Sequence, residues 1–498
     1  MSEFDISLDN AVFTYVVHSK EHRNLSNHIF IKSHNLYLSY SKKTEVISYE
    51  AGENAVYIIG LCVDSHAEID RYDIPKFFLS SKDLSIDSVL RSSLRFAGNY
   101  VIIADINGSL YAFTDATACL QINYSLDEIC ISSFDHVVAQ VLNVPFDRRC
   151  VNIRESSDYV AAMPNDITVY KNIKTVLPNH YFDVLGSKTI RFYPREPLKY
   201  FKSFDDILKK HILLIDNIVK EYAKYIQLIC PLTSGWDSRV VFAFLSKNIK
   251  ELKSYTFFHK NFTDQTADLV IPKAICDSRA AIYYQLPDLE PSMDFFEAVY
   301  NIIGKFYYKE DIAMAYTYRK KFDGYATING NIIDHLGKSS LVNLLPIFFA
   351  SKDYFVAKKR NISFDAKYEV GKYISSIKEI SITKQYIYDL FGIEDQCGRW
   401  CGYSQKIYAA AGVTLLNIFN CREIIENWVS IPHKDRKNYC IHLYFFNSFA
   451  KDLLNFSFNP DEKFKFIGNS KFLFLLTTYA RHFLRKWKKP HLKKNREG

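Results

Sequence analysis

The sequence predicts a mixed fold, in which an antiparallel, sheet-rich N-terminal part is followed by an α/β part with a parallel sheet and a helical C-terminal end. Short β-prone runs and the dipeptide Asn107-Gly108 predict the first part. Strand-like and helix-like runs alternate from residue 226 onward, as they do in parallel sheets with helices on their faces. We place the boundary between the two parts near residue 197.

The N-terminal part contains one strong hairpin signal. Asn99–Asp105 and Ser109–Thr114 are apolar and β-prone, and Asn-Gly between two such runs favours a tight hairpin turn. Shorter runs of the same kind predict further strands at Val12–Val17, Ala55–Leu61, Ile129–Ser132 and Ile167–Val169.

A long amphipathic helix is predicted just after the boundary. Apolar side chains recur every three to four residues between Ile207 and Ala223, which is the period of a helix. Ser203 precedes Asp206 at the spacing of a capping box, so we expect the helix to begin there. The runs that follow predict alternating strands and helices at Ile226–Leu232, Arg239–Leu245, Lys253–Phe257, Leu269–Ile275 and Ala281–Leu286.

Length and composition predict a globular protein of two domains. The 498 residues exceed what one hydrophobic core usually organises, so we expect domains at 1–197 and 198–498. Hydrophobic residues make up 48% of the chain, which excludes a disordered protein. The N-terminus does not have the pattern of a signal peptide, and no apolar run reaches the length of a membrane span. We therefore expect a cytoplasmic protein, and the sequence allows an oligomer.

The net charge of +8 is concentrated at the C-terminus. Residues 481–498 hold eight lysines and arginines and a single acid, so the rest of the chain is close to neutral. Such a tail suits peripheral contact with the anionic inner face of a membrane, and it equally suits a solvated terminus. We do not expect a nucleic-acid partner.

The ten cysteines are scattered and form no CxxC pair. This spacing gives no support to a zinc ribbon or to a thioredoxin-like site. We expect free thiols, as in a reducing compartment.

The sharpest motif is the segment Thr233–Ser238, which follows an apolar strand and precedes a helix. Small residues let backbone N–H groups approach an anion, and the N-terminus of the next helix favours the same anion. Asp237 would repel a phosphate by itself, so its presence predicts a bridging Mg²⁺. On pattern alone, a plain turn with a capping Asp or Ser remains an equal interpretation.

This segment resembles the Ser-Gly-Gly-x-Asp-Ser pyrophosphate loop of the asparagine synthetase and β-lactam synthetase family. Gly235, Asp237 and Ser238 match that pattern as they stand. The resemblance implies an ATP site of the PP-loop pyrophosphatase type, with the end of the second strand against the adenine. The nucleotide-binding residues that it implies are Leu232, Thr233, Ser234, Gly235, Asp237, Ser238, Thr256, Phe257 and Gly330.

A second stretch, residues 326–336, resembles the family's Ser-Gly-Glu-Gly-Ala-Asp-Glu-Leu segment. Gly330 and Asp334 match, whereas Asn331 and His335 replace two glutamates. The resemblance implies that Asp237 and Asp334 are catalytic and hold Mg²⁺. It also places Lys463 over the acyl-adenylate as a third catalytic residue, although a solvated charged loop explains this lysine equally well.

The N-terminal part resembles the family's amidotransferase domain, a sandwich of the Ntn type. Phe96–Tyr100 and Asp115-Ala116 are similar to segments of that domain. Members that hydrolyse glutamine begin Met-Cys-Gly, whereas this chain begins Met1-Ser2. The resemblance therefore implies a ligase that does not hydrolyse glutamine and that takes ammonia or an amine directly.

Together these features predict an AMP-forming carbon–nitrogen ligase that uses ATP and Mg²⁺. Its carboxylate substrate is a small molecule, a sugar or a peptide. Two alternatives remain: a degenerate binding or scaffold protein, which Asn331 and His335 would suit, and a PP-loop enzyme that modifies nucleic acid.

Overall fold

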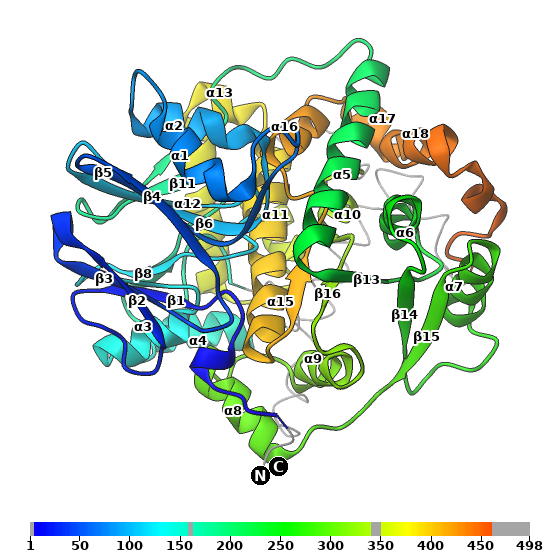
Figure 1. Cartoon of the computed structure of the whole chain (residues 1–498), viewed down its shortest axis with the longest axis horizontal. Coiled ribbons are helices and arrows are strands. Elements are labelled where there is room, and N and C mark those ends of the chain that lie inside the picture. The colour runs from blue at the N-terminus through cyan, green and yellow to red at the C-terminus, as the bar shows by residue number, and fades with distance from the viewer. Residues whose placement is uncertain (1–3, 158–162, 340–349, 461–498) are drawn as a thin grey trace.

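The computed structural model describes residues 4–157, 163–339 and 350–460. This part of the chain contains two antiparallel sheets, one parallel sheet and many helices (Figure 1). The predicted mixed α/β class is therefore confirmed at the level of sheet types. None of the described helices is long and apolar enough to cross a membrane. Ser2, Lys463 and the basic tail lie outside the described residues.

Both antiparallel sheets belong to the N-terminal part, and each has six strands. The first has the order β10 (Ile173–Thr175), β8 (Asn123–Ser125), β9 (Cys130–Ser132), β1 (Tyr15–His18), β3 (Leu36–Tyr40) and β2 (Asn27–Ile31). The second has the order β12 (Lys188–Arg191), β11 (His180–Asp183), β7 (Ser109–Thr114), β6 (Phe96–Ile106), β5 (Asn54–Asp64) and β4 (Val46–Ala51).

Strand β5 shows how the second sheet is buried on both faces. Tyr57 and Ile59 join the main core, which also contains residues of the first sheet. Val56 and Ile58 join a separate core with α1 (Ile74–Leu79) and α2 (Ile86–Ser92). Because successive side chains of a strand point to opposite faces, one face of this sheet packs in the main core and the other is covered by the two helices.

The predicted hairpin is confirmed, because β6 and β7 pair in antiparallel fashion. Asn107 and Gly108 both have positive φ angles, of 53° and 76°, as a two-residue hairpin turn requires. The predicted strand at Ile167–Val169 is wrong, since Ile167 makes only an isolated bridge. There the hydroxyl group of Thr168 donates to the Ile173 carbonyl and accepts from Tyr170 N–H, and such local bonds favour a turn.

The predicted long helix is confirmed as α5 (Asp205–Tyr225). Its buried face includes Leu208, Ile215 and Val219. The predicted capping box is wrong, because Phe204 is the N-cap and no side chain caps the helix. The helix begins one residue later than a Ser203 cap would require, which removes the spacing on which that motif depends.

The parallel sheet has five strands, and the predicted alternation of strands and helices is confirmed. Its order is β15 (Ile282–Pro287), β14 (Lys253–Phe258), β13 (Gln227–Pro231), β16 (Tyr325–Ile328) and β17 (Thr414–Leu416). The connections run outward from β13 on one side and then continue from β16 on the other. In parallel sheets, ligands bind at such a reversal, outside the carboxyl ends of the strands.

Five helices of the described parallel-sheet part lie in the chain between β13 and α11. They are α6 (Trp236–Asn248), α7 (Ala267–Ser278), α8 (Met293–Ile303), α9 (Lys309–Phe322) and α10 (Asn331–Leu336). The predicted helical C-terminal end contains α11 (Lys352–Lys358), α12 (Phe364–Glu379), α13 (Ser381–Lys384), α14 (Ile387–Leu390), a π-helical segment (Phe391–Cys397), α15 (Gly398–Ala410), α16 (Arg422–Val429), α17 (His433–Lys437) and α18 (Cys440–Phe449). The N-terminal part has α3 (Asp135–Leu142) and α4 (Arg148–Glu155) in addition to α1 and α2. Short 3₁₀ turns cover Leu8–Asn10, Lys32–His34, Arg71–Asp73, Ser93–Arg95 and Lys451–Asn455.

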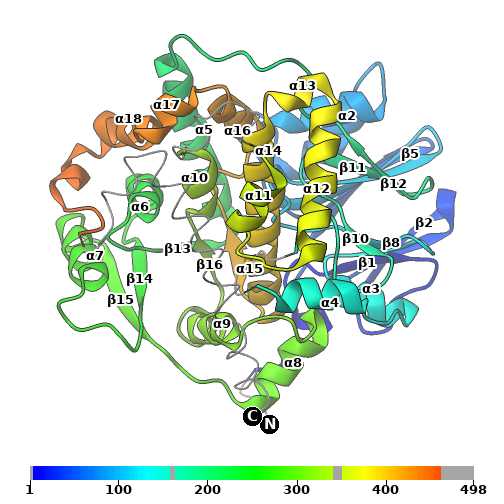
Figure 2. The same cartoon turned by 180° about the vertical axis from the view of Figure 1, so that it is seen from behind.

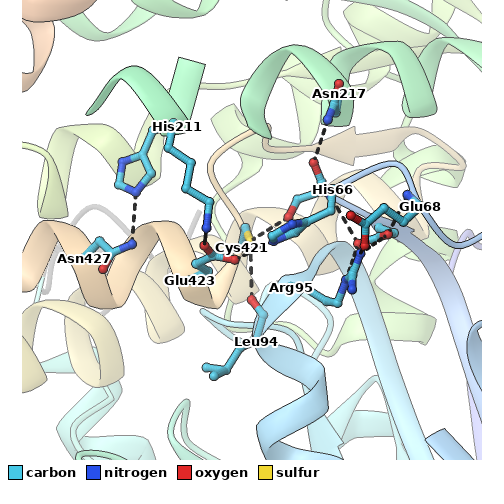
Figure 3. Close-up of polar contacts among 12 residues, drawn as sticks. His66, Glu68, Leu94, Arg95, His211, Asn217, Cys421, Glu423 and Asn427 are labelled. Carbon is cyan, nitrogen blue, oxygen red and sulfur yellow. Dashed lines mark hydrogen bonds and ion pairs between the residues drawn. The ribbon is translucent and has the colours of Figure 1, made fainter. Parts of the chain in front are cut away.

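The two kinds of sheet lie on opposite sides of the molecule, with α11, α12 and α15 between them (Figures 1 and 2). Near the start of α16, polar contacts join the N-terminal part to the parallel-sheet part (Figure 3). Glu423 pairs with His66 at 2.8 Å and with Lys210 at 2.5 Å. Asn217 of α5 donates to the Ser65 carbonyl at 3.1 Å. These contacts fix the N-terminal part against the helices that carry the parallel sheet.

Candidate functional site

The loop between β13 and α6 is closed by its own hydroxyl groups. Thr233 N–H donates to Ser238 Oγ at 3.1 Å, and the two hydroxyl oxygens lie 2.9 Å apart. Gly235 N–H donates to Thr233 Oγ1 at 3.2 Å. Gly235 is also the N-cap of α6, so the loop ends where the first N–H groups of a helix have no intrahelical acceptor. The structure thus has a tight loop that leads directly into a helix N-terminus.

The ends of β13 and β14 are joined beside this loop. Leu232 N–H donates to the Tyr255 carbonyl at 2.8 Å, and Thr256 Oγ1 donates to the Leu232 carbonyl at 2.5 Å. Phe257 follows Thr256 on the same strand. The residues predicted to contact the nucleotide on the two strands are therefore brought together at one edge of the sheet.

Asp268 holds the loop from α7. Ser234 donates to Asp268 Oδ1 through its N–H at 2.8 Å and through its hydroxyl at 2.6 Å. The resemblance implies that Ser234 binds the nucleotide, but here its hydroxyl donates to a carboxylate. The first N–H groups of α6 are then the donors that the loop offers to an anion.

Arg239 anchors the loop from inside α6. Its guanidinium is buried and donates to the carbonyls of Ser234 and Ser457, each at 2.9 Å. It also lies 3.7 Å from the centre of the Phe458 ring. Burial lowers the pKa of Arg239 to about 10. This arginine therefore couples the loop to the chain that follows α18.

The two predicted metal ligands lie together, and one lysine contacts both. Lys338 Nζ lies 3.1 Å from Asp237 Oδ2 and forms a shorter ion pair with Asp334. On its other oxygen, Asp237 accepts a 2.8 Å hydrogen bond from His442 Nε2. His442 belongs to α18 and is fully buried. The structure thus places two carboxylates around one cationic position.

The pKa values in this cluster follow from burial and charge. Burial alone would raise the pKa of Asp237, but the hydrogen bond from His442 and the charge of Lys338 lower it below the usual value. Burial also opposes the charge of Lys338, yet Asp334 and Asp237 together raise the pKa of this lysine. At neutral pH the cluster therefore contains an ammonium group between carboxylates.

Gly330 lets the two loops of the site approach each other. A Cβ atom at this position would lie 3.1 Å from both the carbonyl carbon and the carbonyl oxygen of Asp237. Such contacts are tighter than most Cβ contacts, so the Asp237 backbone would have to move by a few tenths of an ångström. The glycine therefore allows α10, which carries Asp334, to pack against the start of α6.

A cavity of about 450 Å³ lies at the carboxyl ends of β13, β14 and β16. Its wall includes Thr233, Thr256 and Phe257, as well as Asn329 and Asn331 from the loop after β16. Cavities of this size are typical of small-molecule sites. Further aromatic rings line it, which suits a planar base: Tyr255, Phe262, Trp400, Tyr403 and Tyr408.

His335 lies between this cavity and a neighbouring one. Its ring packs edge-on against Trp400, with 4.9 Å between the ring centres. Burial lowers the pKa of His335, while Asp334 opposes the shift. Its Nε2 atom is buried and has no hydrogen-bond partner among the described residues. The predicted position beside Asp334 is thus a wall of the site rather than the metal cluster itself.

The carboxylates of Asp237 and Asp334 suit a metal ion only when a bound substrate completes the coordination shell of the metal. Among residues 4–157, 163–339 and 350–460, no three histidine, cysteine, aspartate or glutamate side chains converge on one point. Mg²⁺ often binds through one or two carboxylates together with the phosphates of a substrate. Asp237 and Asp334 fit that arrangement, provided that Lys338 gives up its position.

Several residues of the site were not predicted from the sequence. Lys338 had a signal, because it lies four residues after Asp334, the spacing of a helical ion pair. Arg239 and His442 had none, since Asp237 lies far from His442 in sequence and three of the four carbonyls that Arg239 contacts follow α18. A comparison with models of known protein families finds no match, and neither does a search of curated proteins.

Proposed function

We propose that the protein is an ATP-dependent ligase that releases AMP and pyrophosphate, activates a carboxylate and joins it to an amine or ammonia. One observation carries the proposal: Asp237 and Asp334 lie around one cationic position next to a loop that leads into the N-terminus of α6. The aromatic cavity of about 450 Å³ beside them supports a nucleotide as the ligand. We call the cavity at the carboxyl ends of β13, β14 and β16 the nucleotide cavity.

In the proposed reaction, a carboxylate oxygen of the substrate attacks the α-phosphorus of ATP. The bond from that phosphorus to the bridging oxygen breaks, and pyrophosphate leaves. The α6 N-terminus would bind the departing phosphates through its N–H groups. Mg²⁺ held by Asp237 and Asp334 would neutralise charge on the phosphates. An amine nitrogen then attacks the acyl carbon, AMP leaves and the nitrogen loses a proton to solvent.

The thiols of the chain favour direct use of an amine or ammonia. All ten cysteines are free, and nine of them are buried. The nucleophile in cysteine chemistry is the thiolate, which burial in apolar surroundings disfavours. The same feature argues against a thiol-dependent enzyme that modifies nucleic acid.

A binding protein without catalysis is the second candidate. Lys338 lies where a cation would be needed, and Asp268 accepts two hydrogen bonds from Ser234. If these contacts persisted with nucleotide present, the site would hold neither Mg²⁺ nor pyrophosphate. The two candidates therefore differ in whether Mg²⁺ and ATP bind together.

Thermal unfolding with nucleotides tests the proposal. We expect Mg-ATP at millimolar concentration to raise Tm, and AMP to raise it less, because AMP lacks the phosphates that the loop would bind. Asp237→Asn should abolish the extra shift from Mg-ATP. The control is Asp323→Asn, whose carboxylate is 72% exposed and lies outside the site. The same Tm shift in the wild type and Asp237→Asn would contradict the proposal.

A further inference from the structure

The nucleotide cavity has a strand side and a helix side. The strand side contains the carboxyl ends of β13 and β14, where the base of a nucleotide is expected. The helix side is formed by α9 and α15, which lie side by side (Figures 1 and 2). A cavity of about 450 Å³ is within the range of drug-sized sites, so a small second ligand has room beside a base.

The charged side chains of the cavity wall are mostly acidic. The described residues that line it include no lysine and no arginine. Its carboxylates are Asp268, which accepts two hydrogen bonds from Ser234, and Asp311, at the start of α9. His259 also lines the cavity, but it lies 3.4 Å from Asp288, which is outside the wall. The wall therefore favours a cation over an anion.

The carboxylate of Asp311 is only partly compensated by its neighbours. The Tyr403 hydroxyl donates to Asp311 Oδ2 at 3.0 Å. The charge of Arg154 also stabilises Asp311, but this guanidinium donates to the Phe306 carbonyl at 2.9 Å and lines a different cavity. Burial outweighs both influences, Glu310 adds to it, and the pKa of Asp311 is raised. A cation inside the nucleotide cavity would therefore stabilise this carboxylate.

Aromatic rings of α15 lie close to the same carboxylate. Burial and the charge of Asp311 raise the pKa of both Tyr403 and Tyr408. The faces of such rings attract cations. Trp400 adds a third ring of α15, and further apolar surface comes from Met314, Ile407 and Leu415. A ligand with an ammonium group and an apolar body matches the carboxylate, the rings and the apolar wall together.

We propose that the helix side of the nucleotide cavity binds the amine substrate, and that this substrate is a primary alkylamine with an aromatic or apolar body, bound as its ammonium ion. The ammonium group lies at Asp311, and the body packs against the rings of α15. Trp400 also packs against His335, next to Asp334, so the helix side extends to the metal-binding cluster. The role as a substrate rests on the proposed function, whereas the binding of an ammonium ion does not.

Isothermal titration calorimetry of the nucleotide-free protein tests the site. The probe is phenethylamine, which is an ammonium ion at neutral pH. Phenethyl alcohol replaces the ammonium group by a hydroxyl, and ethylamine lacks the ring. We expect phenethylamine to bind at millimolar concentrations or below, and each of the other two ligands to bind at least about tenfold more weakly, since each loses either the charged hydrogen bond or the ring contacts.

A second titration separates the helix side from the position of the base. It is carried out with Mg²⁺ and a non-hydrolysable ATP analogue present. The affinity for phenethylamine should stay within about threefold of its nucleotide-free value or increase, because the phosphates attract the ammonium group. Competition between the analogue and phenethylamine would show that the amine takes the place of the base, and would overturn the proposal.

Two variants locate the binding at Asp311. Asp311→Asn should fold normally, because the amide still accepts from Tyr403 and removes a charge that burial disfavours. It should weaken phenethylamine binding at least about tenfold and leave the weak binding of phenethyl alcohol unchanged, which a general disturbance of the cavity would not do. The control is Glu310→Gln, which removes the same charge from the preceding, exposed residue outside the cavity and should bind like the wild type.

The outcomes separate this proposal from the proposed function. No binding of phenethylamine, equal binding of phenethyl alcohol, or equal phenethylamine affinity in the wild type and Asp311→Asn would overturn it. AMP release with ammonium ions, but no phenethylamine binding, would overturn this proposal and leave the ligase proposal intact. Phenethylamine binding that depends on Asp311 would support the site even if no AMP were released, and only the ligase proposal would then fail.

Discussion

Replacement of Lys338 by methionine tests whether this lysine occupies the position of a metal. Methionine keeps most of the side-chain length and removes the charge. Lys338 contacts Asp237 at 3.1 Å and also pairs with Asp334, and its side chain is 28% exposed. Without the ammonium group, the two carboxylates face each other with no cation between them. We therefore expect Lys338→Met to bind a divalent cation without any nucleotide, more tightly than the wild type does.

The size of the effect follows from the geometry. Two unit charges about 4 Å apart interact by about 4 kcal/mol at an effective dielectric constant near 20. Exposure of the cluster reduces this value, and the lost hydrogen bonds of the lysine offset part of it. We expect a net gain of about 1–3 kcal/mol, which corresponds to a cation affinity that is roughly five- to 150-fold tighter.

Electron paramagnetic resonance of free Mn²⁺ measures the affinity directly. The control is Lys305→Met, which removes a lysine that is 73% exposed and lies outside the cluster. As a second readout, Tm of Lys338→Met should fall in EDTA, because the carboxylates repel each other, and should recover with Mn²⁺. Equal Mn²⁺ affinity in Lys338→Met, Lys305→Met and the wild type would refute the assignment of Lys338 to the cation position.

Three further predictions follow from packing and burial. Gly330→Ala should abolish the Tm shift with Mg-ATP, because the new Cβ would press on the Asp237 backbone at 3.1 Å. The control is Gly371→Ala, whose new Cβ would have its nearest contact at 3.5 Å. An unchanged Tm shift in Gly330→Ala would show that the close approach is unnecessary. Burial lowers the pKa of His211 to about 4 from an ordinary 6.5, so between these values the unfolded chain binds more protons than the folded protein, and the free energy of unfolding falls as the pH is lowered from 6.5 to 4. His211→Gln should remove about 3 kcal/mol of that fall, measured by urea unfolding at pH 4 and pH 7; the same pH dependence as the wild type would contradict the reasoning. Arg239→Met should lower the free energy of unfolding by at least about 3 kcal/mol, because four carbonyl groups lose a buried donor, and a loss below about 1 kcal/mol in the same urea assay would contradict this role.

Local sequence patterns predicted which helices and strands form better than they predicted the residues at which these elements begin and end. The Asn107-Gly108 turn and the apolar stripe of α5 are set by neighbouring residues, so the sequence alone was sufficient for both. The predicted start of α5 was wrong, because Phe204 precedes the helix and no side chain caps it. The predicted strand at Ile167–Val169 was wrong, because the Thr168 hydroxyl makes local hydrogen bonds that favour a turn.

The candidate site was predictable where it lies on one loop and not where distant elements meet. The predicted residues Thr233–Ser238 do form a closed loop before a helix. His442 reaches Asp237 from α18, more than two hundred residues later in the chain. No spacing rule links two such positions, since the contact depends on how the helices pack. The cavity beside His335 likewise draws its lining from α10, α11, α14 and the π-helical segment, and α10 and α11 are distant in sequence from the other two.

The proposed ligase activity is tested most directly by identifying the products that the protein forms from ATP. Purified protein would be incubated with Mg-ATP, ammonium ions and a panel of small-molecule, sugar and peptide carboxylates, and the phosphorus-containing products would be identified by ³¹P nuclear magnetic resonance. We expect AMP and pyrophosphate, formed only when a substrate carboxylate is present. Asp237→Asn and Asp334→Asn should each reduce the rate by about a hundredfold or more, as removal of one stabilising group does in other active sites. ADP and phosphate as products, or equal rates in the wild type and both variants, would contradict the proposed ligase activity.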